Sequence, residues 1–340
     1  MTGRAAVVPE ANVVHLEDIE IPGPVGPNEV LVQTECTFIS AGTELANFTG
    51  LDPGVNVPGS WNHFPARPGY ANCGRVIELG SDVESLTVGD RVFTQRKHVS
   101  HHLVPVDDPN TIVVPVPEDV PSDLAAAVRM GMVAITAPQV ADNHVNDWVV
   151  VFGLGLVGNL AAQLFQLDGA RVIGVDPVLA RRQLAHRVGI QRVIGEDMST
   201  IVDQLRDLTG GGAQTVVEAV GHAGVAQTAI HAAAPYGELI LLGSPRAPVT
   251  ADLNDFLQPV HKSWVTIKGA LEHRVPVNPA RGHPLSIAGN ARTILNLVAY
   301  GRLRLAELIS HRLPASRIAA AYDGLLNQPN EYWGVALDWR

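Results

Sequence analysis

The middle of the chain alternates short apolar runs with stretches of helical periodicity. The clearest run, Trp148–Phe152, is continuously apolar, as expected of a parallel strand buried on both faces. Helices of roughly ten residues fit between most of the strands predicted after it. These strands are Arg171–Asp176, Gln191–Ile194, Thr215–Val220, Gly237–Gly243 and Val265–Gly269. The repeated unit predicts a doubly wound α/β sheet of six parallel strands.

Before residue 122 the pattern is β-rich and interrupted by proline and glycine. The predicted strands are Arg4–Val8, Val14–Ile19, Glu29–Phe38, Ala71–Leu79, Asp90–Thr94 and Leu103–Val106. Ser122 is a plausible N-cap for a helix that reaches about Asp142. After residue 272 the pattern changes again. We expect a helix near Ile287–Tyr300, a strand near Glu307–Arg312, a helix at Ala315–Asn327 and a strand at Tyr332–Trp339.

Three glycines follow the strand Trp148–Phe152 with dinucleotide-binding spacing. Gly153 permits a tight turn, Gly155 lets the backbone approach a pyrophosphate, and Gly158 lets the next helix pack closely on the strand. Asp176 ends the following strand, where a carboxylate binds the adenosine ribose. It favours NAD, because it would repel a 2′-phosphate. The alternative is a glycine turn that binds nothing. The predicted cofactor residues are Gly153, Gly155, Leu156, Val157, Gly158, Asp176, Arg181, Val220 and Gly243.

Composition narrows the class of protein. A chain of 340 residues is too long for one ordinary core, which favours two domains. The formal charge of -10 argues against binding to nucleic acid or to an acidic membrane surface. Two cysteines exclude a disulfide scaffold and a four-cysteine zinc lobe. No apolar run is long enough to span a bilayer, and the first ten residues lack a signal-peptide core, so we expect a cytoplasmic enzyme.

Several motifs together resemble the medium-chain dehydrogenase/reductase superfamily, of the alcohol dehydrogenase type. They are Gly42-Thr43-Glu44, Pro68-Gly69-Tyr70, Gly74-Arg75-Val76, Val88–Val92, the glycine turn and His311–Pro314. The resemblance implies a discontinuous GroES-like β-barrel catalytic domain at residues 1–133 and 272–340. It implies a Rossmann NAD-binding domain at 134–271 and an active site in the cleft between the two. It also implies a homodimer that pairs the strand near Val265–Gly269 with its copy.

The chain departs from the zinc-dependent members at each zinc-ligand position. Ala41 stands where they have a cysteine, Tyr70 where they have a histidine, and about Met132 where they have a second cysteine. Alanine and methionine do not replace a zinc-binding cysteine, and tyrosine is an uncommon zinc ligand. The chain is therefore similar to a zinc-independent branch. That branch includes the dehydrogenase of bacteriochlorophyll synthesis that oxidises a hydroxyethyl side chain.

The histidines His98, His101 and His102 raise the question of a different metal site. In an extended segment neighbours face opposite sides, and so do residues three apart, so at most two of the three converge. We predict no metal site. Either His98 or His101 faces the substrate, or the histidines are structural.

Without zinc, side chains must take up the hydroxyl proton as an alcohol becomes a carbonyl. The resemblance places Thr43 where a hydroxyl contacts the reacting oxygen and begins a proton relay; otherwise it bonds its own loop. Tyr70 holds the substrate oxygen or fills space, and Glu44 bonds Tyr70 or a backbone group. The run Arg96-Lys97-His98 either attracts an anion or is a solvated loop. The predicted catalytic residues are Thr43, Tyr70, Glu44 and His98.

The sequence thus predicts a zinc-independent, NAD-dependent oxidoreductase that acts on a secondary alcohol or its ketone. A second reading is a reductase of an activated C=C or C=N bond, which needs no alkoxide and often uses NADPH. Two others are a non-catalytic NAD-binding homologue and a zinc enzyme with shifted ligands.

Overall fold

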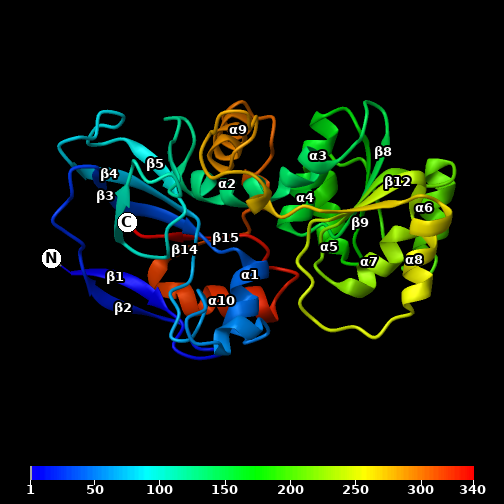
Figure 1. Cartoon of the computed structure of the whole chain (residues 1–340). Helices are drawn as coiled ribbons and strands as arrows, with labels where there is room; N and C mark the ends of the chain where they lie inside the picture. The colour runs from blue at the N-terminus through cyan, green and yellow to red at the C-terminus, as the bar shows by residue number, and fades with distance from the viewer. Residues whose placement is uncertain (1) are drawn as a thin grey trace. The chain divides into compact units, whose positions relative to one another are not determined.

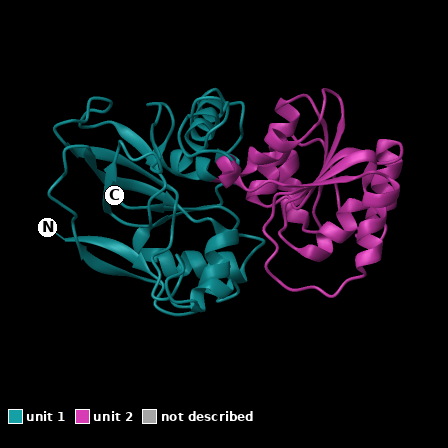
Figure 2. Cartoon of the chain, in the orientation of Figure 1, with its two compact units in different colours: residues 1–129, 275–340 teal, residues 130–274 magenta. Residues whose placement is uncertain are grey.

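The computed structural model describes residues 2–340 and divides into two compact units, each described by itself below (Figure 2). Unit 1 contains the chain up to Arg129 and again from Val275, and unit 2 is Met130–Arg274. The first boundary follows residue 129 rather than 133, and the second precedes residue 275 rather than 272.

Unit 2 is built on a parallel sheet, in which Figure 1 labels β8, β9 and β12. The strand order is β10-β9-β8-β11-β12-β13. Its strands are β8 (Trp148–Phe152), β9 (Arg171–Val175), β10 (Arg192–Ile194), β11 (Ala213–Glu218), β12 (Ala233–Leu241) and β13 (Thr266–Gly269). After β10 the chain returns to the middle of the sheet, so the direction of winding reverses between β8 and β11. This order confirms the predicted doubly wound sheet, and such a reversal is where ligands bind in α/β folds.

Helices precede or connect these strands and bury the sheet. They are α3 (Thr136–Val140), α4 (Leu156–Leu167), α5 (Leu179–Arg187), α6 (Ile201–Thr209), α7 (Ala223–Ile230) and α8 (Leu253–Lys262). Alternate residues of β8, among them Val150 and Phe152, share a buried cluster with Ile201 of α6 and Ile230 of α7. All five residues of β8 are buried, which accounts for its unbroken apolar sequence.

The helix expected from Ser122 to Asp142 is two helices, α2 (Ser122–Ala134) and α3, so the prediction of one helix was wrong. Pro138 has no backbone N–H with which to continue a helical bond to Ala134. The Thr136 hydroxyl lies 2.7 Å from the carbonyl oxygens of both Val133 and Ala270. The Ser122 hydroxyl donates to Glu35 Oε2 at 2.5 Å, so it serves a contact between distant segments.

Unit 1 is organised around the long strand β3 (Glu29–Phe38), which pairs with β4 (Asn72–Leu79), β6 (His101–Pro105) and β15 (Val335–Asp338). Its other strands are β1 (Thr2–Val7), β2 (His15–Glu20), β5 (Arg91–Thr94), β7 (Val113–Pro115) and β14 (His311–Pro314). This is the GroES-like architecture that was predicted, with a barrel core that includes Val32, Val76 and Val104. Strand β7 was not predicted, and the strand expected at Glu307–Arg312 begins only at His311.

The helices of unit 1 come from distant parts of the chain. They are α1 (Ala41–Phe48), which was not predicted, α9 (Ile287–Ala299) and α10 (Ile318–Asn327). Helices α1 and α10 pack together (Figure 1), with the rings of Phe48 and Tyr322 edge to face and their centroids 5.1 Å apart. Among the helices that the structure describes, none combines the length and the apolar character required to cross a bilayer.

Candidate functional site

The glycine turn of unit 2 has the geometry that its spacing predicts. Gly153 has φ +91°, and a Cβ there would lie 2.6 Å from Val220 Cγ2. At Gly158 a Cβ would lie 1.9 Å from the Gly153 carbonyl oxygen, so helix α4 can pack this closely only with glycine. A Cβ at Gly155 would have no atom within 4 Å among residues 2–340. The turn is therefore tight at its base and open beside Gly155.

Helix α4 begins at Leu156, directly after Gly155, which is its N-cap residue. The N–H groups of Leu156 and Val157 belong to the first helical turn, where no earlier helical carbonyl can accept them. With the positive end of the helix dipole, they suit a phosphate. A dinucleotide pyrophosphate thus fits the turn by both space and charge.

Asp176 closes this turn from the end of β9. Its carboxylate is 1% exposed, and Oδ2 accepts the Leu154 N–H at 2.8 Å. Oδ1 accepts the Val178 N–H at 2.8 Å, and Arg181 Nη1 lies 3.6 Å from Oδ2. The carboxylate therefore shapes the cofactor turn itself, a role that the sequence reading did not foresee. Arg181 brings positive charge to the same place.

The remaining predicted cofactor residues lie at the carboxyl ends of β11 and β12. Val220 is 53% exposed and presents its side chain beside Gly153, whereas its N–H donates to Glu218 Oε1 at 2.8 Å. At Gly243 a Cβ would lie 2.1 Å from the Gly221 nitrogen, so the two loops approach closely only because this residue is glycine. The cofactor candidates thus gather where the winding of the sheet reverses.

In unit 1 the second group of candidates surrounds the start of α1. Ser40 is the N-cap residue, yet its hydroxyl does not cap the helix. Its Oγ instead accepts a hydrogen bond from the Tyr70 hydroxyl. The Ser40 N–H donates to Glu44 Oε1 at 2.8 Å, so a side chain four residues later satisfies this N–H at the start of the helix. The Ser40 hydroxyl therefore holds Tyr70 and not the helix N-terminus. Ser40 was missing from the predicted residues, although a serine at a helix start is a signal that could have been used.

Glu44 is a buried acceptor that joins three parts of the chain. Its Oε2 accepts the Tyr322 hydroxyl at 2.6 Å and lies 2.9 Å from His98 Nε2. A carboxylate only accepts, so His98 Nε2 carries the proton in this contact. Burial raises the pKa of Tyr322, and the charge of Glu44 raises it further. Glu44 bonds a backbone group, as one of its predicted alternatives proposed, but also two side chains that the sequence did not indicate.

His98 is fully buried, which favours the alternative that it is a structural histidine over the one in which it faces the substrate. Glu44 holds one ring nitrogen, and the buried Nδ1 has no hydrogen-bond partner among residues 2–340. Gly69, with φ +95°, packs against this ring, and a Cβ there would lie 2.7 Å from His98 Cγ. The His98 side chain therefore packs behind Gly69 and supports the backbone next to Tyr70.

Tyr70 is the best placed polar group of unit 1 for substrate chemistry. Burial raises the pKa of its phenol, while the Arg129 guanidinium and hydrogen bonds with Ser40 and Thr43 lower it. Arg129 lies over the Tyr70 ring, 4.9 Å from the centroid. Thr43, half-buried in the first turn of α1, thus meets Tyr70, as a relay would require. Ser40 and Arg129 are the two neighbours that sequence reasoning missed.

The other histidines do not converge on a metal. His102 is buried between Thr34 Oγ1 and Thr94 Oγ1, at 3.5 and 3.1 Å, and burial lowers its pKa to about 3. His101 is the first residue of β6, and its Nδ1 lies 3.1 Å from Ser100 Oγ. Among residues 2–340, no group of three histidine, cysteine, aspartate or glutamate side chains is arranged to hold a metal ion. The donors present, with Ala41 at the start of α1 and Met132 inside α2, do not fit a catalytic zinc.

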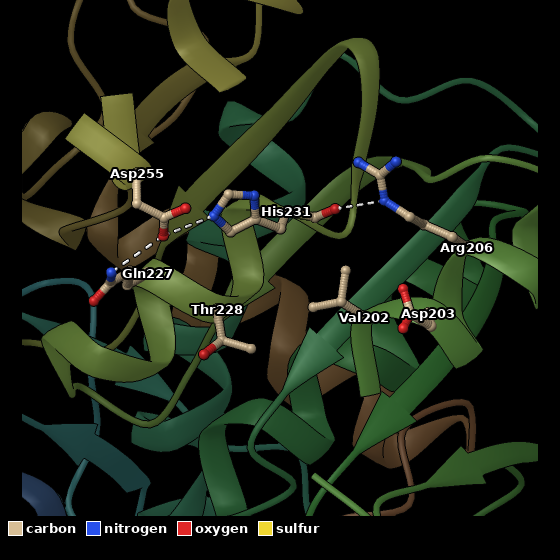
Figure 3. Close-up of a pocket in the computed structure, with 7 residues that line it drawn as sticks. All are labelled: Val202, Asp203, Arg206, Gln227, Thr228, His231 and Asp255. Atoms are coloured by element: carbon tan, nitrogen blue, oxygen red, sulfur yellow. Dashed lines mark hydrogen bonds and ion pairs between the residues drawn. The ribbon is translucent and has the colours of Figure 1, made fainter. Parts of the chain in front are cut away.

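A separate hollow lies among helices α6, α7 and α8 of unit 2 (Figure 3). There Asp255 Oδ2 accepts from His231 Nε2 at 3.1 Å and from Gln227 Nε2 at 3.2 Å, and Arg206 donates to the His231 carbonyl at 3.0 Å. The bonds of Asp255 tie α8 to α7, and the bond of Arg206 ties α6 to α7 (Figure 3). None of the predicted site residues lines this hollow.

Two family models match the chain. The alcohol dehydrogenase GroES-like domain matches residues 26–106, and the model described as zinc-binding dehydrogenase matches residues 157–274. The second match lies outside the positions of Ala41, Tyr70 and Met132, so its description does not bear on them.

Curated relatives include D-guloside 3-dehydrogenase of Escherichia coli (strain K12), 30% identical over 63% of this chain; the chain spans 65% of that protein's length. L-threonine 3-dehydrogenase of Xanthomonas euvesicatoria pv. vesicatoria (strain 85-10) is 30% identical over 64% of this chain and 71% of its own length.

Solved structures share the fold over nearly the whole chain. The 2R,3R-butanediol dehydrogenase of Bacillus subtilis has a TM-score of 0.82 at 19% identity, and covers 99% of this chain and 100% of its own. An E. coli dehydrogenase crystallised with NADH has a TM-score of 0.81 at 18% identity, and covers 99% of each chain. Both matches show the fold alone. The two domain models and the threonine dehydrogenase relative mean that the chain belongs to the medium-chain dehydrogenase/reductase superfamily, of the alcohol dehydrogenase-like type.

Proposed function

We propose that this protein is an NAD-dependent oxidoreductase that transfers hydride between a secondary alcohol, or its ketone, and nicotinamide without a zinc ion. The observation that carries the proposal is the glycine turn held by Asp176 and open beside Gly155. When bound there, the nicotinamide supplies the hydride acceptor or donor. The relatives are named as dehydrogenases of hydroxyl-bearing compounds, which favours an alcohol over a C=C or C=N bond.

We infer that Tyr70 handles the proton of the substrate oxygen. Burial raises the pKa of its phenol, so the hydroxyl is protonated near neutral pH and can donate to a carbonyl oxygen. Ser40 and Thr43 hydrogen-bond with this hydroxyl from α1 and its N-cap. In the oxidative direction the phenolate form of Tyr70 would accept the alcohol proton and become the phenol again. Arg129, over the ring, favours the phenolate that forms when Tyr70 gives up its own proton.

The preference for NAD rests on Asp176. Its carboxylate would repel a 2′-phosphate, although Arg181 at 3.6 Å offsets part of this charge. NAD should therefore bind more tightly than NADP, and Asp176→Ala should weaken NAD binding as well, because the Leu154 N–H would lose its partner.

The test combines metal analysis with turnover. We expect the purified protein to contain no stoichiometric zinc, to bind NAD more tightly than NADP in calorimetry, and to reduce NAD with a secondary alcohol in the presence of a chelator. Tightly bound Zn²⁺ whose removal abolishes turnover would refute the zinc-independent mechanism. NAD binding without turnover on any alcohol or ketone would favour a non-catalytic homologue.

A further inference from the structure

Unit 2 has a second hollow, here called the amino-edge pocket, where the strands β8, β9 and β10 begin. Its volume is about 430 Å³, and its lining includes Trp148, Arg171, Arg192, Gln166 and Gln191. The predicted cofactor residues lie at the other end of the strands. Strand β8 has five residues, so at about 3.3 Å per residue its two ends are roughly 13 Å apart. None of the predicted cofactor or catalytic residues lines the amino-edge pocket, which therefore needs an explanation of its own.

The register of the strands places two arginines and a tryptophan on one face of the sheet. Trp148 of β8 and Arg171 of β9 are direct partners, and Arg192 of β10 pairs with Ile173, two residues after Arg171. Side chains two residues apart on a strand point to the same face. Trp148 and Ile173 also share one buried cluster, in agreement with this register. Both arginines thus lie beside the same indole.

The indole of Trp148 holds the two guanidinium groups in place. Arg171 Cζ lies 4.1 Å and Arg192 Cζ 5.4 Å from the centroid of the Trp148 ring. The ring itself is fixed, because Trp148 is only 8% exposed and belongs to the core of unit 2. Stacking uses the flat face of a guanidinium and leaves its N–H groups, which lie in the plane, directed outward. Two positive charges held at one ring repel each other, so an anion between them would be stabilising.

Most of the donors of these arginines have no partner in the protein. Arg171 Nε donates to the Asn146 carbonyl at 2.8 Å, which fixes that guanidinium further. Among residues 2–340, no carboxylate forms an ion pair with Arg171 or Arg192, and no group accepts a hydrogen bond from the Arg192 guanidinium. Both side chains are exposed at the pocket, where Gln191 adds an amide. The pocket thus presents two positive charges and several free N–H groups to a ligand.

We propose that the amino-edge pocket binds a phosphate group, with the guanidiniums of Arg171 and Arg192 on its oxygens. A phosphate monoester carries close to two negative charges and three acceptor oxygens, which match two guanidiniums better than a single carboxylate does. The volume is within the range of small-molecule sites, about 300–1,000 Å³, so there is room for an organic group attached to the phosphate. The inference does not rest on the proposed function, because the pocket shares no residue with the cofactor turn or with Tyr70.

The test is calorimetric titration with inorganic phosphate, with glucose 6-phosphate and with glucose, at about pH 8, where the phosphate group is a dianion. We expect saturable binding of both phosphates and none of glucose. Arg192→Met should raise the Kd for phosphate about tenfold or more, since charge-assisted hydrogen bonds are lost, whereas Arg192→Lys should lose less. Arg302→Met, at an exposed arginine of unit 1, is the control and should behave as wild type.

The two phosphates distinguish the sources of the ligand. Tighter binding of glucose 6-phosphate would identify a phosphate ester as the ligand, and equal binding would identify free phosphate. Gly155→Asp places a carboxylate at the glycine turn, the other anion site of unit 2, and should leave binding at the amino-edge pocket unchanged.

Three results would overturn the inference: no saturable binding of either phosphate, wild-type affinity in a folded Arg192→Met variant, or loss of binding in Gly155→Asp. None of them would touch the proposed function, because Arg192→Met should bind NAD as wild type does. Conversely, phosphate binding that depends on Arg192 in a protein that neither binds NAD nor turns over an alcohol would support this site and count against the oxidoreductase. Circular dichroism and thermal melts verify that each variant is folded.

Discussion

Glu44 shows how much a single residue depends on its tertiary surroundings. Its three hydrogen-bond donors are the Ser40 N–H, the His98 imidazole and the Tyr322 hydroxyl. The first is local, because Ser40 and Glu44 lie four residues apart at the start of α1. The other two lie 54 and 278 residues away in sequence. No local pattern indicates such partners, because only the packing of α1 on α10 and on the loop between β5 and β6 brings them together.

We predict that Glu44→Gln destabilises the protein. The glutamine amide would turn an N–H₂ donor toward groups that themselves donate, and would leave at least one of them unpaired in the core. The expected loss in the free energy of unfolding is about 1–3 kcal/mol. Urea unfolding measures it, with the exposed Glu10→Gln as control. Equal midpoints for the two variants would mean that this network contributes little to stability.

Thr43 and Ser40 are predicted to act on the chemical step and to leave cofactor binding unchanged. Thr43→Val and Ser40→Ala each remove a hydroxyl that contacts Tyr70, so hydride transfer should slow by about tenfold or more. Single-turnover absorbance of the reduced nicotinamide gives the rate. Thr49→Val, at the other end of α1, removes a hydroxyl that bonds only the Leu45 carbonyl within its helix and should leave this rate unchanged. Wild-type rates in both site variants would reject the relay.

Gly155→Asp should abolish NAD binding with little loss of stability. The backbone at Gly155 has φ −61°, and a Cβ there meets open space among residues 2–340, so the fold accepts a side chain. The new carboxylate would face the pyrophosphate and repel it. The neutral, equally large Gly155→Asn separates charge from bulk and should retain more affinity. Calorimetric titration measures the affinity of each variant for NAD. Unchanged affinity in Gly155→Asp would overturn the cofactor assignment.

At the scale of elements, the strand β6 contains a histidine that should make stability depend on pH. Burial lowers the pKa of His102 to about 3, so the folded protein keeps this ring neutral, whereas in the unfolded chain it binds a proton below about pH 6.5. The unfolded state therefore binds more protons between these values, and stability falls as the pH drops from about 6.5 toward 3.

We predict that His102→Gln is less stable than wild type at pH 7 but loses less stability on acidification to pH 4. The glutamine amide can still bond the threonine hydroxyls beside it but cannot be protonated. The measurement is urea unfolding at both pH values, with the exposed His15→Gln as control. If His102→Gln loses as much stability as wild type between the two, another group is responsible.

Elements differ in how well the sequence predicted them. Strands β3 and β8 were predicted with their observed bounds, because alternation or a continuous apolar run is a property of the segment alone. The break between α2 and α3 was missed, although Pro138 signalled it. Helix α1 was missed as well. It is short, and three of its eight residues are buried, including Glu44, so its periodicity was weak.

At the scale of the whole molecule, we predict that the protein is a homodimer formed through β13. This strand is at the edge of the described sheet, where it pairs with β12. Beside it, the exposed rings of Tyr236 and Trp264 stack with centroids 4.9 Å apart. An edge strand next to exposed aromatic groups is a surface that a second copy could extend.

Size-exclusion chromatography with light scattering should give twice the mass of the chain, and Ile267→Pro should shift the protein toward monomer, because proline cannot donate to a paired strand. The equivalent Val114→Pro, in β7 of unit 1, tests whether any proline in a strand has this effect. A monomeric wild-type protein would refute the dimer.

The sequence alone determined the doubly wound sheet and the glycine turn. Both depend on residue types within one segment, where periodicity and steric size act locally. Only the tertiary structure decided that Asp176 holds the turn, that His98 is buried behind Gly69, and that Ser40 serves Tyr70. These contacts join segments far apart in the chain, and hydrogen-bond partners at that range are chosen by the packing of the elements.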